Sequence, residues 1–178
     1  MIKISQLKKE YFDKLNERPV KINPFDPKSV TVAKKYVEKL NKLLEEFNLK
    51  AVHRGSTYFK ISGKGDIEIG IYPNKNNWDK TIQKLKTHYR IIGKIEEDYA
   101  RFNDKIGQYE IEIILMKGQS AKIDKGLTRY LKNNPEILKK YERIKTKYSS
   151  SKKEYSIQKD KFFQRIIKQI YAKHNCPN

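Results

Sequence analysis

The chain has 178 residues, of which 37% are hydrophobic and 11% aromatic, enough for one compact domain with a helical appendage and too many for a disordered chain. Its formal net charge of +19 favours a nucleotide or nucleic acid over a membrane surface as partner, although a proteome generally rich in lysine would also give a high isoelectric point. Because Cys176 is the only cysteine, an internal disulfide and a zinc site with several thiolates are excluded. No apolar run suits a signal peptide or a membrane span, so a soluble cytoplasmic protein is expected.

The first part of the chain alternates helical and strand patterns. A short amphipathic piece surrounds Tyr11, and Ser29 is the predicted N-cap of a long helix that continues to about Asn48. A second helix is predicted from Trp78 to about Tyr89 by its apolar spacing. Strands are predicted over residues 49–53, 66–72, 90–95, 98–102 and 108–115, with turns at Glu96-Glu97 and Asn103-Asp104.

From Ser120 onward the apolar spacing becomes helical throughout, and three helices rich in lysine are predicted. The fold class is therefore α/β (α+β), with a small mixed sheet flanked by helices and followed by a C-terminal helical segment. We expect residues 1–118 to form the α/β core with an N-terminal helical extension. Residues 119–178 are expected to form a basic helical region packed on that core.

The most informative motif lies between residues 53 and 69. A Gly55-Ser56 turn is followed, after a gap of nine residues, by Asp66-Ile67-Glu68 on an apolar strand. Residues two apart on a strand point to the same side, which puts Asp66 and Glu68 roughly 7 Å apart at their Cα atoms. Two such carboxylates suit Mg²⁺, or Mn²⁺, and the turn offers N–H groups and a hydroxyl to a triphosphate.

A third acid is expected from the strand over residues 109–115. This strand alternates, with Glu110 and Glu112 on one side and isoleucines on the other. Either glutamate could complete a three-carboxylate cluster with Asp66 and Glu68, and the sequence leaves the choice open. The same alternation also fits a sheet that simply has one face in water.

Basic residues are candidates for phosphate contacts. Lys64, two residues before Asp66, could reach a triphosphate or could be a solvated turn lysine. Lysines interleaved with tyrosines over residues 139–155 could form a base-stacking, backbone-tracking surface, or could be the wet face of amphipathic helices.

Several segments together resemble the GrpB family, which belongs to the nucleotidyltransferase superfamily. They are His53–Thr57, Gly63–Ile69, Thr128–Pro135, Tyr141–Lys145, and Tyr155 with Lys159, and they occur in order over about residues 50–170. The resemblance implies a nucleotidyltransferase-type core with a helical tail. It also implies that Gly55 and Ser56 form the phosphate-contacting turn, that Asp66 and Glu68 are metal ligands, and that Arg129, Tyr155 and Lys159 bind the nucleotide.

The chain departs from the family pattern at two places. The loop before Asp66 is shorter than is common, and Glu110 and Glu112 stand where many members have histidines. The expected function is Mg²⁺-dependent transfer of a nucleoside monophosphate from an NTP such as ATP to a hydroxyl acceptor, for which RNA is one candidate. The alternative is a non-catalytic nucleotide- or nucleic-acid-binding protein on the same fold.

Overall fold

The computed structural model describes residues 9–89 and 91–172, and these form two compact units. One unit, here called the sheet unit, comprises residues 24–61 and 65–122. The other, the helical unit, comprises the described residues of 9–23, 62–64 and 123–172. The boundary between the two units, at residues 122 and 123, lies inside a helix, and each unit is described by itself.

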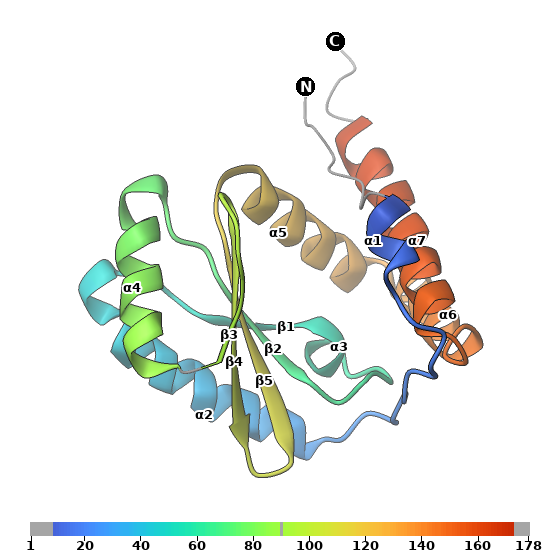
Figure 1. Ribbon diagram of the computed structural model, residues 1–178, viewed down its shortest axis with the longest axis horizontal. Helices are drawn as coiled ribbons and strands as arrows, with labels where there is room; N and C mark the ends of the chain where they lie inside the picture. Colours follow the sequence, from blue (N-terminus) through green and yellow to red (C-terminus); the bar gives the residue numbers. More distant parts are fainter. Residues whose placement is uncertain (1–8, 90, 173–178) are drawn as a thin grey trace. The chain divides into compact units, whose positions relative to one another are not determined.

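The sheet unit holds five strands in the order β1-β2-β5-β4-β3 (Figure 1). The strands are β1 Val52–Arg54, β2 Ile67–Ile71, β3 Ile91–Ile95, β4 Tyr99–Ile106 and β5 Tyr109–Met116. Only the β2–β5 pair is parallel, and the other pairs are antiparallel. The sheet is therefore mixed, as the sequence predicts.

One face of this sheet forms the apolar core. Isoleucines at alternate positions of β2 and β5 point to that face and are fully buried, as the period of two requires. Helices α2 (Lys28–Leu43) and α4 (Trp78–His88) supply the opposing apolar residues, including Tyr36, Leu40 and Leu85. The opposite face keeps the polar residues of the same strands.

The predicted turn at Asn103-Asp104 is wrong, because β4 continues through it to Ile106. Both residues pair with β5, and the turn lies instead at Gly107, whose φ is 56°. Asp104 is held in the strand by the Tyr36 hydroxyl, which donates to its Oδ2 at 2.7 Å.

The long first helix also differs from its prediction at both ends. It begins at Lys28 and ends at Leu43, followed by the 3₁₀ turn η1 (Glu45–Phe47). Ser29 lies inside the helix, and its hydroxyl donates to the carbonyl of Asp26 at 2.6 Å.

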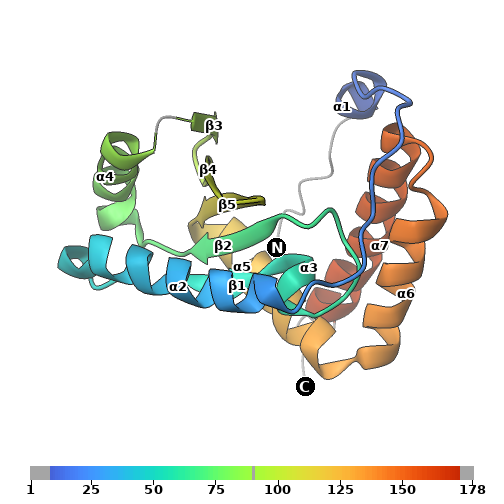
Figure 2. The ribbon, with the colours of Figure 1, turned by 90° about the horizontal axis from the view of Figure 1, so that it is seen from below.

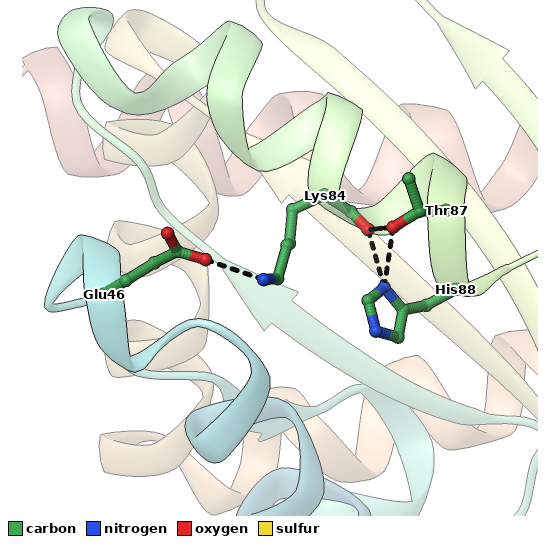
Figure 3. Close-up of polar contacts among 4 residues, drawn as sticks. All are labelled: Glu46, Lys84, Thr87 and His88. Carbon is green, nitrogen blue, oxygen red and sulfur yellow. Dashed lines mark hydrogen bonds and ion pairs between the residues drawn. The ribbon is translucent and has the colours of Figure 1, made fainter.

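Polar contacts hold the edge of this helical layer (Figure 3). Lys84 of α4 pairs with Glu46 of η1 at 2.8 Å. His88 Nδ1 lies 2.9 Å from the Lys84 carbonyl oxygen and 2.9 Å from the Thr87 hydroxyl, at the end of α4. His88 thus caps a helix. His174 and Cys176 lie outside the described residues.

The helical unit contains α1 (Lys9–Asp13), the second half of α5 (Gly118–Asn133), α6 (Pro135–Lys147) and α7 (Lys152–Ala172). Helices α6 and α7 lie side by side as a hairpin (Figure 2). Tyr141 of α6 stacks on Phe162 of α7, with ring centroids 5.5 Å apart and planes inclined by 14°. Within the described part of the chain, no helix is long and apolar enough to cross a bilayer.

Candidate functional site

The parallel pairing of β2 and β5 brings acidic side chains together on the polar face of the sheet. Glu68 of β2 is the register partner of Glu112 of β5, so the two side chains lie on one face of neighbouring strands. Asp66 directly precedes β2 and is half-buried. Glu110 is exposed and pairs across β4 with Lys105. The register therefore favours Glu112 over Glu110 as the neighbour of Glu68.

Two arginines flank this acid pair, one from the neighbouring strand on each side, β1 and β4. Arg54 of β1 has its Nε 3.7 Å from a Glu68 carboxylate oxygen, and Arg101 of β4 has an Nη 3.7 Å from a Glu112 carboxylate oxygen. The side chains of Glu68 and Glu112 are 23% and 24% exposed, so bulk water screens these charges only partly. The four residues form a row across four strands in which the two glutamates lie between the two arginines, and we call them the Arg–Glu row.

The backbone beside the Arg–Glu row is shaped to make room for these long side chains. A Cβ added to Gly70 would lie 3.1 Å from Arg54 Cδ, and one added to Gly93 would lie 2.9 Å from Arg101 Nε. Arg101 is absent from the sequence-based site. The only signal for it was its alternation on β4, which is uninformative without the pairing to β5.

The Gly55-Ser56 turn lies against the carboxylate of Glu68. Strand β1 ends at Arg54, the partner of Glu68, and Gly55 opens the single helical turn α3 (Gly55–Tyr58). Gly55 has φ of 75°, and a Cβ there would lie 2.7 Å from both Cδ and Oε1 of Glu68. Only glycine satisfies both the backbone angle and this close approach.

His53 lies next to this turn and pairs with it. Its Nε2 is 2.8 Å from the hydroxyl of the buried Thr57 in α3. Burial lowers the pKa of His53 below its ordinary value of 6.5, and the charge of Glu68 opposes that shift only in part. The imidazole is therefore neutral near pH 7 and serves to hold the turn on β1.

Residues 62–64, which lead into Gly65-Asp66, belong to the helical unit by their contacts. The Ser62 amide donates to Glu142 Oε1 at 2.7 Å, and the Lys145 ammonium donates to the Ser62 carbonyl. Gly63 exchanges two backbone hydrogen bonds with Asn23, of 2.7 and 3.0 Å. The three residues before Gly65-Asp66 are thus fixed on both sides.

The side chains that contact Ser62, Glu142 and Lys145, are both charged. Lys145 is 1% exposed, and its ammonium also lies 4.7 Å from the Tyr141 ring centroid. Partial burial raises the pKa of Glu142, but the Ser62 hydrogen bonds and the Lys145 charge outweigh it and leave that pKa below its ordinary value. Lys145 is one of the lysines that the sequence places on a basic surface, and its burial corrects that interpretation.

The remaining predicted nucleotide contacts all lie in the helical unit. Lys64 is exposed, and its carbonyl accepts a hydrogen bond from the Asn23 side chain at 3.0 Å. Arg129 of α5 is exposed and Lys159 of α7 half-buried. Tyr155 is 7% exposed, so its ring is mainly a packing element of α7.

A divalent cation fits the carboxylates that lie at this part of the sheet. As the side chains stand, no three His, Cys, Asp or Glu groups among the described residues are close enough to share one metal ion. Asp66, Glu68 and Glu112 are nevertheless hard oxygen donors on one stretch of sheet, with a glycine turn packed against the central one. A cation would meet Glu68 and Glu112 in the place of their arginines.

A family profile and several solved structures match this chain. The sequence profile described as GrpB protein matches residues 19–169. The crystal structure of the conserved protein GrpB from Enterococcus faecalis is similar with a TM-score of 0.66 and 17% identity, over 86% of this chain and 99% of that one. Cid1 in complex with its short product ApU matches with a TM-score of 0.48 and 8% identity, over 76% of this chain and 42% of the Cid1 chain. Among curated protein sequences, none matches.

Proposed function

This chain belongs to the GrpB family, and we propose that it is a metal-dependent nucleotidyltransferase. The observation that supports the proposal is the pairing of Glu68 with Glu112 beside a glycine turn that touches Glu68. Carboxylates on neighbouring parallel strands next to a glycine turn suit an NTP whose phosphates carry a divalent cation.

In this proposal Asp66, Glu68 and Glu112 hold Mg²⁺ or Mn²⁺, and Gly55 and Ser56 seat the triphosphate. The bound cation supplies positive charge opposite the phosphate oxygens, where negative charge accumulates during transfer. Arg54 and Arg101 balance Glu68 and Glu112 before the nucleotide arrives, since each lies 3.7 Å from its partner. Guanidinium groups at these positions also suit pairing with phosphate.

The reaction is an in-line substitution at the α-phosphorus. A hydroxyl oxygen of the acceptor forms the new P–O bond while the bond to the β-phosphate oxygen breaks, so that pyrophosphate leaves and the hydroxyl proton passes to a carboxylate or to water. Within the helical unit, Arg129 and Lys159 stay predicted nucleotide contacts, as the resemblance to the GrpB family implies, and Tyr155 supports α7 by packing. We propose RNA as the acceptor class to test first because of the net charge of +19.

The test is incubation with α-labelled NTPs, Mg²⁺ and total RNA, followed by a denaturing gel. We expect label to enter RNA with the parent protein, and to be lost with EDTA and with the near-isosteric Asp66→Asn. Circular dichroism and urea unfolding check that the variant is folded. A folded Asp66→Asn protein that transfers as well as the parent would refute the mechanism.

The same experiment separates the alternative function, binding without turnover. In that case no label is transferred, and nucleotide or RNA binding weakens with salt but is insensitive to EDTA.

A further inference from the structure

The helical unit contains a groove that the proposed transfer site does not use. It has a volume of about 380 Å³ and is lined by both helices of the α6–α7 hairpin. Its apolar lining comes from both helices and consists of Ile137, Ile144, Phe162 and Ile166. Its polar lining consists of Lys140, Arg143, Arg165 and Gln169, all of them exposed.

The charge around this groove has a single sign. Lys140, Arg143 and Arg165 make no ion pair or side-chain hydrogen bond with any residue in the described part of the chain, and no acid lines the groove. Two acids of the same helices are engaged elsewhere: Glu142 accepts from Ser62, and Asp160 accepts from Gln164. Three uncompensated cations around an apolar surface repel one another, and an anionic ligand would reduce the free-energy cost of this repulsion.

From these features we propose that the α6–α7 groove binds single-stranded nucleic acid, with a base on its apolar lining and the backbone phosphates on Arg143 and Arg165. Phe162 offers a flat ring already backed by Tyr141, which suits base stacking. Guanidinium groups pair with phosphate through two parallel hydrogen bonds. The volume suits a unit the size of one nucleotide.

A membrane surface fits these features less well. The apolar side chains of the groove are buried or half-buried rather than protruding. Among the residues whose burial is described, the exposed large hydrophobic ones, Tyr11, Val52, Ile95 and Ile106, all lie on other elements. Binding in the groove does not require transfer chemistry at the Arg–Glu row, so each proposal can fail alone.

The proposal is tested by fluorescence anisotropy with a labelled oligouridylate about 15 nucleotides long, its deoxythymidylate counterpart, and an abasic strand of equal length and charge. The variant is Arg143→Gln with Arg165→Gln. Its matched control is Lys139→Gln with Lys161→Gln, which removes the same charge from exposed positions of the same helices outside the groove. Thermal unfolding checks that both proteins are folded.

We expect the arginine variant to weaken oligouridylate binding about tenfold or more and the control about threefold or less. Loss of two phosphate contacts should also reduce the magnitude of the log–log salt slope by about 1.4, because each contact to a single strand contributes about 0.7. The abasic strand should bind about tenfold more weakly than oligouridylate. Asp66→Asn should bind like the parent, whether or not the protein transfers nucleotides.

Three results would overturn the proposal. Equal losses in the arginine variant and the lysine control would mean diffuse charge attraction, and equal binding of the abasic strand would mean that the groove takes no base. Cosedimentation with vesicles of anionic phospholipid, without oligonucleotide binding, would assign the groove to a lipid surface. Tighter binding of oligouridylate than of the deoxy strand would support the proposal and show that 2′-hydroxyls contribute.

Discussion

Replacing Gly55 with alanine probes the contact between the turn and the central carboxylate. The new methyl group would sit 2.7 Å from the Glu68 carboxylate, in a backbone with φ of 75°. The positive φ costs about 1–2 kcal/mol for an L-residue. Relief of the overlap, which moves Glu68 off its position, costs about 1–3 kcal/mol more. We therefore expect Gly55→Ala to lower the free energy of unfolding by roughly 2–5 kcal/mol.

Gly107→Ala is the matched control for the backbone angle. Its φ is 56°, and an added Cβ meets no atom within 4 Å, so it should cost only the backbone part, about 1–2 kcal/mol. Urea unfolding of the two variants measures the difference directly. Repeating Gly55→Ala in a Glu68→Ala background should remove the steric part, because the atoms that it meets are gone. Equal costs for Gly55→Ala and Gly107→Ala, or an unchanged cost in the Glu68→Ala background, would refute this reasoning.

Two further predictions concern buried polar groups. Lys145→Met should lower the free energy of unfolding by roughly 2–4 kcal/mol, because Lys145 is 1% exposed and its loss leaves the Ser62 carbonyl without this hydrogen bond. The control, Lys139→Met at an exposed position of the same helix, should lower it by less than about 0.5 kcal/mol. Similar urea midpoints for the two variants would contradict this. The pKa of His53 in the folded protein lies below 6.5, so as the pH falls the unfolded chain takes up a proton before the folded protein does. The stability that comes from the neutral imidazole is therefore present above about pH 6.5 and is lost as the pH falls through the folded pKa. His53→Gln should flatten that part of the pH profile of the urea midpoint, and an unchanged profile would argue against the shift.

Most of the secondary structure was predictable because local pattern and environment agree. The β2 strand, helix α4 and the helices after Ser120 follow their apolar spacing closely. The predicted turn at Asn103-Asp104 failed because turn-forming residues were held in a strand by a partner 68 positions away, Tyr36. Contacts of that range leave no trace in a local pattern.

The candidate site was predictable only in part, for a similar reason. Asp66, Glu68 and Gly55 form a local motif and can be recognised without a structure. The choice of Glu112 depends on the parallel register of β2 and β5, which the sequence does not contain.

The arginines and the buried lysine were harder still. Arg101 can be assigned to the candidate site only when its ion pair with Glu112, on the neighbouring strand β5, is known. Lys145 looked like one more lysine of a basic helix, and its burial depends on the contact between α6 and the segment at Ser62.

The most direct test of the proposed site is a titration with Mn²⁺, followed by its electron paramagnetic resonance signal, in the presence of a non-hydrolysable NTP analogue. We expect Glu68→Gln and Glu112→Gln each to weaken Mn²⁺ binding about tenfold or more, since each removes a charged ligand. Glu110→Gln removes the same charge from an exposed position two residues away and should leave the affinity unchanged. Equal effects of Glu110→Gln and Glu112→Gln, or full affinity in Glu68→Gln, would contradict a cation held by the paired carboxylates of β2 and β5.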